Sequence, residues 1–329
     1  MMYRIEPASE VGIIIYPDCQ LGMVHGLTEM LDVAGRFAAT HDRAPLRVSH
    51  WQLRDGMVER TFDSHPDAKH SGDPDILIAP GSMHSLISAS QAAPFARFLQ
   101  DHHARGALLA STCAGAFLLA ETGLLEGRPV TTHWYFADAF RERFPGVRLE
   151  IDRMVIDDGD IVTAVGLMAW TDLGLRIVER LLGQTLMMET AKFLLLDPPG
   201  VREQRHYAPF APRLTHGDEA ILKVQHWLQA SEARSVSVDD MAREAHLEER
   251  TFLRRFKAAT GFKPIEYVQH LRISKARELL EFTRRSVEQI AWGVGYEDAA
   301  AFRKLFHRII GLSTGDYRQK FAAPMSDDA

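Results

Sequence analysis

The sequence feature that most constrains the fold is an imperfect repeat near the C-terminal end of the chain. The segment DDMAREAHLEERTFLRRFKAATGFKPIEY, residues 239–267, is echoed by VEQIAWGVGYEDAAAFRKLFHRIIGLSTGDY, residues 287–317. The matching positions include two phenylalanines, a glycine and a tyrosine in each copy. Because an internal repeat marks a supersecondary unit that is present more than once, we expect two similar modules here.

Each copy has the pattern of a helix, a tight turn and a second helix that ends at a glycine. In the first copy Phe252 and Phe256 lie four residues apart, and Phe302 and Phe306 repeat this spacing in the second copy. Residues at this spacing share one helical face, which we expect to pack on the preceding helix. The pattern predicts an all-α domain over residues 218–322 with two helix-turn-helix units.

Arginine and lysine side chains occupy the stripe beside each buried face. A guanidinium group is suited to reading guanine in the major groove, whereas lysine and the cations of the connecting helix suit phosphates. A single charged stripe is about as often only a solvated surface, but two stripes at matched spacing favour double-stranded DNA as the partner. The candidate DNA-binding residues are Arg250, Arg254, Lys257, Arg272, Lys275, Arg303 and Lys304.

The first two thirds of the chain have a different pattern, in which β-branched runs alternate with helical segments. VGIIIY at 11–16, DILIAP at 75–80 and GALLAS at 106–111 each precede a helix-like stretch. This alternation is typical of βαβ units around a buried parallel sheet. We therefore predict an α/β parallel-sheet domain over residues 1–196, followed by a proline-containing linker at 197–217.

The segment STCAG, residues 111–115, lies between a strand-like and a helix-like stretch. A sharp strand-to-helix elbow crowds its neighbours, so the residues around it must be small. Cys113 is then expected at a helix N-terminus, where the helix dipole favours the thiolate and lowers the thiol pKa. His133 follows the next strand and Glu29 lies in the first helix, so all three side chains can meet at one sheet edge. A buried filler cysteine and a core histidine remain the alternative.

These segments resemble the DJ-1/PfpI superfamily, which has the class I glutamine amidotransferase-like fold, a flavodoxin-like α/β sandwich. The resemblance is carried by VGIIIYPD, GLTEML, DILIAPGS, STCAGAFLLAETGLLEGR and TTHW. It implies a candidate, vestigial triad of Cys113, His133 and Glu29. It also implies a ligand pocket lined by Cys113, Glu29, His133, Gly81, Ser82, Ala114 and Trp170.

The C-terminal repeat resembles the AraC/XylS DNA-binding domain, through RTFLRRFKAATGFKP in the first unit and IAWGVGYEDAAAFRKLFHRIIGLS in the second. The second unit departs from that pattern at Thr314, where proline is usual. Together the two halves resemble GlxA/FtrA-like transcriptional regulators. This resemblance implies a homodimer that binds promoter half-sites, and RNA polymerase as a partner if the protein activates transcription.

Three functions remain open for the first domain. The favoured one is a sensor for a small effector, with nitrogenous metabolites as the candidate class, bound near Cys113. Trp170 then either forms an aromatic wall that binds a cationic ligand or packs between helices. The rival is a cysteine-dependent hydrolase, hydratase or glyoxalase-like enzyme with an attached DNA-binding domain. A thiol redox sensor is the third. We favour a regulator that is not an enzyme.

Composition narrows these choices further. With 46% hydrophobic and 25% charged residues, the chain has the composition of a soluble globular protein. Its longest apolar stretch, around Cys113, is broken by polar residues and glycines, so we expect a cytoplasmic protein without a membrane span. Two cysteines suit a reducing compartment, and no cluster has metal-ligand spacing, so we expect no metal and no cofactor. The net charge of the whole chain is -6, but residues 218–321 hold more Lys and Arg than Asp and Glu, so the rest of the chain is clearly acidic, which argues against DNA contact by the first domain.

Overall fold

The computed structural model describes residues 9–68, 73–82, 85–199 and 206–322. The chain divides by its contacts into two compact units, Met1–Gln204 and Arg205–Ala329. The first is an α/β sandwich, and all the regular elements in the described part of the second are helices, so the predicted fold class is confirmed.

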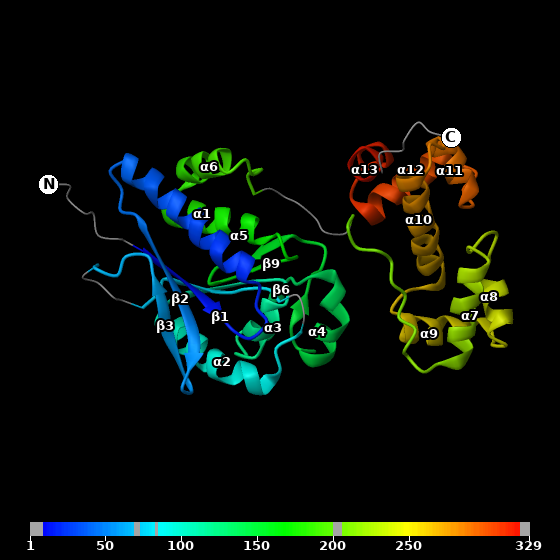
Figure 1. Ribbon diagram of the computed structural model, residues 1–329. Helices are drawn as coiled ribbons and strands as arrows, with labels where there is room; N and C mark the ends of the chain where they lie inside the picture. The colour runs from blue at the N-terminus through cyan, green and yellow to red at the C-terminus, as the bar shows by residue number, and fades with distance from the viewer. Residues whose placement is uncertain (1–8, 69–72, 83–84, 200–205, 323–329) are drawn as a thin grey trace. The chain divides into compact units, whose positions relative to one another are not determined.

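A mostly parallel sheet forms the centre of the first unit (Figure 1). In the described chain it has seven strands, in the order β3 (Met57–Asp63), β2 (Leu46–Arg54), β1 (Ser9–Ile15), β4 (Ile76–Ala79), β5 (Leu108–Thr112), β9 (Ile161–Ala164) and β8 (Val155–Asp157). Neighbours from β2 to β9 are parallel, and the edge strands β3 and β8 are antiparallel to theirs. β4, β5 and β9 are buried at every residue, as strands covered on both faces must be.

Helices cover both faces of this sheet. In Figure 1, α1 (Leu21–Thr40), α5 (Trp170–Leu182) and α6 (Gln184–Phe193) lie on one face, and α2 (Ala89–Ala104) and α3 (Gly115–Ala120) lie on the other. The short strands β6 (Pro129–Val130) and β7 (Arg148–Leu149) pair with each other, and between them come η1 (Trp134–Phe136) and α4 (Ala137–Arg143). The carboxyl ends of β1, β4 and β5 therefore lie side by side at one sheet edge, as predicted.

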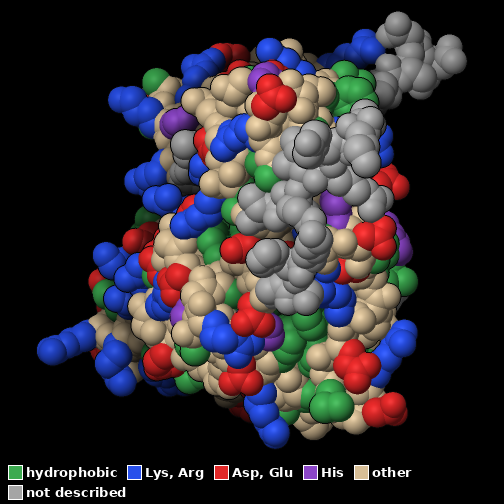
Figure 2. All heavy atoms as spheres, turned by 90° about the vertical axis from the view of Figure 1, so that its left-hand side faces the viewer, with side chains coloured by type: hydrophobic (Ala, Val, Ile, Leu, Met, Phe, Trp, Pro, Cys, Tyr) green, Lys and Arg blue, Asp and Glu red, His purple; other side chains and the backbone are tan. Residues whose placement is uncertain are grey.

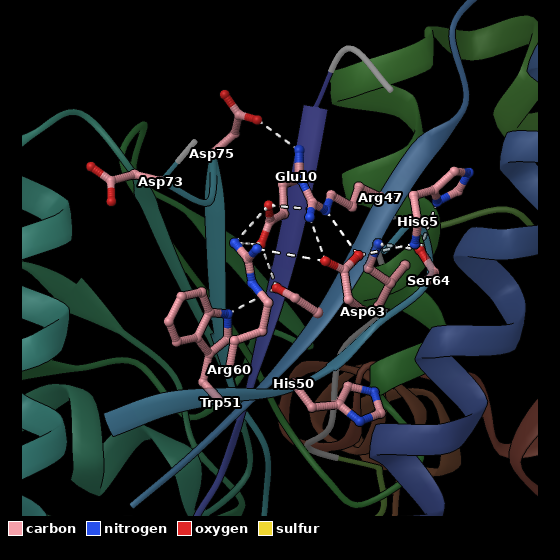
Figure 3. A network of polar contacts seen from close by, with 12 residues as sticks. Glu10, Arg47, His50, Trp51, Arg60, Asp63, Ser64, His65, Asp73 and Asp75 are labelled. Atoms are coloured by element: carbon pink, nitrogen blue, oxygen red, sulfur yellow. Dashed lines mark hydrogen bonds and ion pairs between the residues drawn. The ribbon is translucent and has the colours of Figure 1, made fainter. Parts of the chain in front are cut away.

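A buried ion network fastens β1, β2 and β3 together (Figure 3). Arg47, only 3% exposed, donates from Nε to Asp63 over 2.9 Å. Glu10, 5% exposed, accepts from Arg60 at 2.9 Å and from the Ser49 hydroxyl at 2.5 Å. Because each buried charge has an opposite partner, the cost of removing it from water is offset. Burial alone raises the pKa of Asp63, but the Arg47 hydrogen bond and the nearby cations outweigh it and lower that pKa.

The second unit consists of two helix-turn-helix units joined by one long helix. Its elements are α7 (Glu219–Ala230), α8 (Val238–Glu244), α9 (Glu249–Thr260), α10 (Pro264–Phe282), α11 (Val287–Gly293), α12 (Ala299–Ile310) and α13 (Thr314–Phe321). The pairs α8/α9 and α11/α12 are the two units, and each has its own buried cluster. Gly261 and Gly311 end α9 and α12 in the left-handed conformation, with φ of 81° and 83°.

Capping side chains account for where the helices of the repeat begin. The Ser237 side chain accepts from the amide of Asp240 at the start of α8, and Ser286 accepts from the amide of Gln289 at the start of α11. In both cases the third helical residue bonds back to the capping residue, which completes a capping box. The repeat therefore extends to the local signals that start its helices.

Residues 206–217, which we call the strap, belong to the second unit. The guanidinium of Arg277 in α10 donates to the main-chain carbonyls of His206 and Ala208. Phe210 packs against the buried cluster of the first helix-turn-helix unit. The strap lies inside the segment 197–217, which the sequence predicts to be a linker. It nevertheless packs on the helical domain, because Phe210 contacts the first buried cluster and Tyr207 contacts Phe321.

Candidate functional site

The strand-to-helix elbow has the geometry that its small residues predict. β5 ends at Thr112, α3 begins at Gly115, and between them Cys113 has a φ of +49°. Few residues other than glycine adopt this left-handed conformation, and such strain is concentrated at functional sites. A Cβ at Gly115 would lie 2.6 Å from the carbonyl oxygen of Pro80, so the close approach of the β4 end requires glycine.

Cys113 itself is fully buried, with 0% of its surface exposed. Its amide donates to the carbonyl of Ala164 over 2.8 Å, and its carbonyl accepts from Oγ1 of Thr132 at 2.6 Å. Burial raises the pKa of the thiol to about 11, although a hydrogen bond from the Ala114 amide works in the opposite direction. The expectation of a lowered pKa is therefore wrong, because α3 is a six-residue helix whose dipole is outweighed by burial.

Glu29 does not lie where the triad requires it. It is exposed on α1, whereas Cys113 is buried. The α1 side chain that reaches the elbow is Met23, whose Sδ lies 3.0 Å from Oγ1 of Thr112. Glu29 is about 9 Å further along the helix axis, given a rise of about 1.5 Å per residue. The predicted carboxylate role of Glu29 is therefore not supported, since a thioether occupies the position nearest the elbow.

His133 is half-buried at the start of η1, where its Nδ1 accepts from the amide of Tyr135 over 3.1 Å. Burial lowers the pKa of its imidazole, so the ring is neutral at physiological pH. The neighbouring Thr132 binds the main chain of Cys113. His133 thus caps a short helix next to the segment that contacts the elbow.

The remaining predicted pocket residues are mostly engaged in packing. The Gly81 amide donates to Oγ1 of Thr112 over 3.0 Å, so this amide already has a partner within the sheet edge. Ser82 is 1% exposed, and its main chain forms an isolated antiparallel β-bridge with that of Cys19. Ala114 is 2% exposed. These three residues are therefore buried at this edge of the sheet, where little of their surface can contact a ligand.

Trp170 lies against α1 at Gly26. A Cβ on Gly26 would approach the Trp170 ring to 2.6 Å, so the glycine makes room for the indole. This contact favours the helix-packing interpretation of Trp170 over the aromatic wall. Exposed apolar side chains near this edge are instead Tyr135 at 71% and Met168 at 65%.

The described residues offer neither a metal site nor a membrane-spanning helix. They contain no group of three or more His, Cys, Asp or Glu side chains that could hold a metal ion. No described helix is both long enough and apolar enough to cross a membrane. Both cysteines are free thiols, and burial raises the pKa of Cys19 as well.

The exposed face of α9 carries unpaired cations. Phe252 and Phe256 are 0% exposed and pack within the first helix-turn-helix unit, as predicted. Arg250, Arg254 and Lys257 are exposed on the other side of the helix, and in the described chain none of them has an ion-pair partner. These three side chains are free to meet a phosphate or a base.

A groove of about 700 Å³ lies beside this face. It runs between α9 and the start of α10 and reaches the end of α12. Its lining combines apolar side chains with five basic ones and one carboxylate, Glu266. Of its lining residues, only Arg250, Arg254 and Lys257 belong to the predicted set. Two of its cations, Lys263 and Arg308, were missed; Lys263 was detectable, because the following proline marks a helix start. Its cationic lining residues are Arg250, Arg254, Lys257, Lys263 and Arg308.

The second recognition helix, α12, repeats the burial pattern with a different set of outer side chains. Phe302 and Phe306 are 0% exposed in their own cluster. Lys304 is exposed, whereas Arg303 forms an ion pair with Glu288 of α11. The cations predicted on α12 are therefore outward-facing, but one of them is already paired.

Arg272 and Lys275 on α10, both predicted to bind DNA, form contacts within the helical domain. Arg272 donates from Nε and Nη2 to the carbonyl of Ala233, over 2.9 and 2.8 Å, and from Nη1 to that of Gly295 over 3.3 Å. It thereby holds loops of both helix-turn-helix units to α10. Lys275 binds Glu278 at 3.0 Å, which raises its pKa. Neither cation is free for a phosphate in this structure, because both already have partners.

Arg255 holds α9 against the start of α7. Its guanidinium forms two hydrogen bonds, of 2.9 and 2.7 Å, with Asp218, whose side chain also caps α7. The hydrogen bond from Arg255 lowers the pKa of the Asp218 carboxyl. This pair distinguishes Arg255, which holds α9 on α7, from its neighbour Arg254, which faces solvent.

Charge elsewhere on the surface is mixed. On the face drawn in Figure 2, Lys and Arg side chains are interspersed with Asp and Glu side chains and form no continuous patch. A nucleic-acid surface needs its cations gathered on one side. The α9 groove meets that requirement through five basic residues in one lining.

The geometry defines a two-domain chain, in which an α/β sandwich with a strained cysteine elbow precedes paired helix-turn-helix units. Residues 49–180 match the DJ-1/PfpI family, and residues 241–320 match a helix-turn-helix domain. The chain therefore carries a DJ-1/PfpI domain followed by an AraC-type helix-turn-helix domain.

Several relatives are HTH-type transcriptional regulators. ArgR of Pseudomonas aeruginosa is 27% identical over 215 residues, which are 65% of each chain. CdhR of the same species is 26% identical over 254 residues, covering 77% of this chain and 71% of CdhR. GlxA of Rhizobium meliloti is 27% identical over 65% of this chain and 66% of GlxA. The match thus spans about two thirds of the length of these relatives.

Solved structures match each unit separately. Drosophila melanogaster DJ-1beta matches with a TM-score of 0.45 and 20% identity, over 57% of this chain and 98% of its own. The DNA-binding domain of AdpA, solved with a target DNA, matches with a TM-score of 0.30 and 30% identity, over 31% of this chain and 92% of its own.

Proposed function

We propose that this chain is a sequence-specific DNA-binding transcriptional regulator, with α9 and α12 as its recognition helices. The observation that carries the proposal is the duplicated arrangement, in which each helix buries two phenylalanines and turns cations outward. Helix-turn-helix proteins bind in this way, with the second helix of each unit in the major groove. The relatives named above are regulators of transcription, which supports the same function.

Selection of genomic fragments by the full-length protein tests this proposal. We expect the wild type to retain a small set of fragments that share a motif, and the variant Arg250→Ala/Arg254→Ala to lose them. Arg234→Ala is the matched control, since Arg234 is an exposed arginine whose side chain, among the described residues, pairs with Glu232 on the same loop alone. Equal, motif-free retention by all three proteins would refute the proposal.

The DJ-1/PfpI domain, proposed as residues 1–196, is the effector-binding part. Support comes from the strained backbone at Cys113, because such strain is usually retained only at functional positions. For regulation, the effector must bind two states of the protein with different affinity. Small nitrogenous metabolites are the first class to screen, with full-length protein in a thermal-shift assay. A ligand of the folded state raises the melting temperature, whereas no shift with any member of the class excludes that class.

A cysteine-dependent enzyme is the rival, and the elbow conformation of Cys113 favours it. The raised thiol pKa and the exposed Glu29 favour the sensor, because they leave the thiol protonated without a carboxylate beside it. Turnover of amides or aldehydes that disappears in Cys113→Ser supports the enzyme. A DNA response that persists in Cys113→Ser supports a non-covalent sensor.

A homodimer is proposed from the family resemblance, so that two helical domains address two half-sites. Sedimentation equilibrium of the full-length protein without DNA tests it, with twice the chain mass expected. RNA polymerase is a partner only if transcription rises when the protein binds its promoter.

A further inference from the structure

The two recognition helices differ at matched positions of their exposed faces. Aligning Phe252 with Phe302 places Arg250 opposite Ala300 and Arg254 opposite Lys304. All four of these outer residues are exposed. Equivalent places in the two units therefore present two guanidinium groups on α9, but a methyl group and an ammonium on α12.

The α9 face is suited to hydrogen-bonded reading of bases. Arg250 and Arg254 lie one helical turn apart, and neither has a hydrogen-bond or ion-pair partner among the described residues. Each planar guanidinium can donate two parallel hydrogen bonds to O6 and N7 of a guanine. Leu253, 37% exposed between them, offers methyl groups suited to the C5-methyl of thymine.

The α12 face has no guanidinium at the two positions matched to Arg250 and Arg254. Its first turn presents Ala300 and Ala301, whose side chains form no hydrogen bonds. Arg303 is paired with Glu288, so a base contact by Arg303 must first break that pair and approach a carboxylate. Lys304 is exposed, but an ammonium is a point charge that suits phosphate better than the edge of a particular base.

We propose that the two units read DNA unequally, which rests on the function proposed above. α9 specifies guanine-containing sequence through Arg250 and Arg254, whereas α12 contacts phosphates through Lys304 and thymine methyl groups through its alanines. The operator then has one segment of high information content. A second segment, rich in A·T and tolerant of change, lies about one helical turn, or about 10 base pairs, away.

Selection of bound sequences from a random duplex library by full-length protein, followed by binding of single-base variants, tests the inequality. We expect guanine replacement in the first segment to lower affinity about tenfold or more, and any replacement in the second segment to lower it by less than about threefold. Equal base discrimination in both segments would overturn the unequal reading while leaving DNA-binding intact. Absence of any selected sequence would overturn the proposed function as well.

Paired variants assign the roles. Arg254→Lys keeps the charge but loses the bidentate geometry, so it should relax discrimination at one guanine while leaving the affinity for unrelated DNA nearly unchanged. Lys304→Ala should weaken binding to all sequences alike and reduce the slope of log K against log salt by about 0.9. If Lys304→Ala relaxed discrimination as strongly as Arg254→Lys, α12 would be a reader of bases and the proposal would fail.

A gain of function completes the test. Ala300→Arg/Lys304→Arg gives α12 the outer pair found on α9. We expect this variant to acquire a preference of about tenfold for guanine in the second segment. If the variant still binds DNA but tolerates every base in the second segment as the wild type does, the side chains at positions 300 and 304 do not determine base preference, and the proposal fails.

Discussion

Nε of Arg277 donates a 2.7 Å hydrogen bond to the hydroxyl of Tyr317. The same guanidinium donates to the carbonyls of His206 and Ala208, so it joins α10, α13 and the strap. Tyr317 in turn donates to the Glu281 carboxylate; burial, followed by this carboxylate, raises the pKa of Tyr317 to about 12. The segment through which the chain enters the helical domain is thus fixed to α10, and through Arg277 to α13.

Arg277→Met should destabilise the helical domain by roughly 1–3 kcal/mol, because it leaves carbonyl and hydroxyl groups without their donor. Urea unfolding followed by circular dichroism measures the change. Arg234→Met is the control, since it removes only an exposed ion pair and should cost less than about 0.5 kcal/mol. Equal effects of the two substitutions would show that the strap contacts contribute nothing to stability.

Neighbouring residues of α9 should separate stability from DNA binding. Phe252 is 0% exposed and Leu253 is 37% exposed. Phe252→Ala should cost about 3–5 kcal/mol of unfolding free energy through the cavity that it leaves, whereas Leu253→Ala should cost under about 1 kcal/mol. Thermal or urea unfolding checks this order, and a reversal would mean that α9 packs through the opposite face.

The elbow glycine should tolerate no side chain. Gly115→Ala places a methyl group against the carbonyl oxygens of Ala79 and Pro80, and should cost about 1–3 kcal/mol or more. Gly22→Ala in α1 is the matched control, because its added methyl group meets nothing within 4 Å. That control should be neutral or slightly stabilising. Wild-type melting of Gly115→Ala would contradict the close approach of the two strand ends.

Stability should fall below neutral pH because of His50. Burial, together with the nearby His25, lowers the pKa of His50 to about 4. The unfolded chain, with an ordinary pKa near 6.5, then binds the proton more readily, so the stabilising effect of a neutral His50 is present above pH 6.5 and is lost as the pH falls toward 4. From pH 7.5 to 5.0 the loss is about 2 kcal/mol. Urea unfolding of the wild type and His50→Gln at both pH values measures it, and identical pH dependence would refute it.

The helix-turn-helix pair could be predicted in detail because the repeat supplies the same signal twice. Periodicity alone identified the buried phenylalanines and the outward cations of α9. Arg272 could not be assigned this way, since its partners are the carbonyls of Ala233 and Gly295, which lie in loops that only the tertiary fold brings to α10. Helical spacing shows which way a side chain points but not whether another segment already binds it.

The α/β domain was predictable in architecture but not in the chemistry of its elbow. The alternation of strands and helices indicated the parallel sheet, and small residues indicated the turn at Cys113. The triad role of Glu29 stays a prediction that its exposure does not support, because the start of α1 decides which residues face the elbow, and Met23 contacts Thr112 there. The thiol pKa depends on complete burial, which no local pattern reveals.

The central claim is that the outward arginines of α9 bind duplex DNA, and the salt dependence of binding tests it most directly. Fluorescence anisotropy with a selected operator duplex should give log K that falls linearly with log salt between 50 and 200 mM. Arg250→Ala/Arg254→Ala should bind at least about 30-fold more weakly at each salt concentration, given about 1–3 kcal/mol for each base contact. Identical binding curves for the wild type and the double variant would contradict the account.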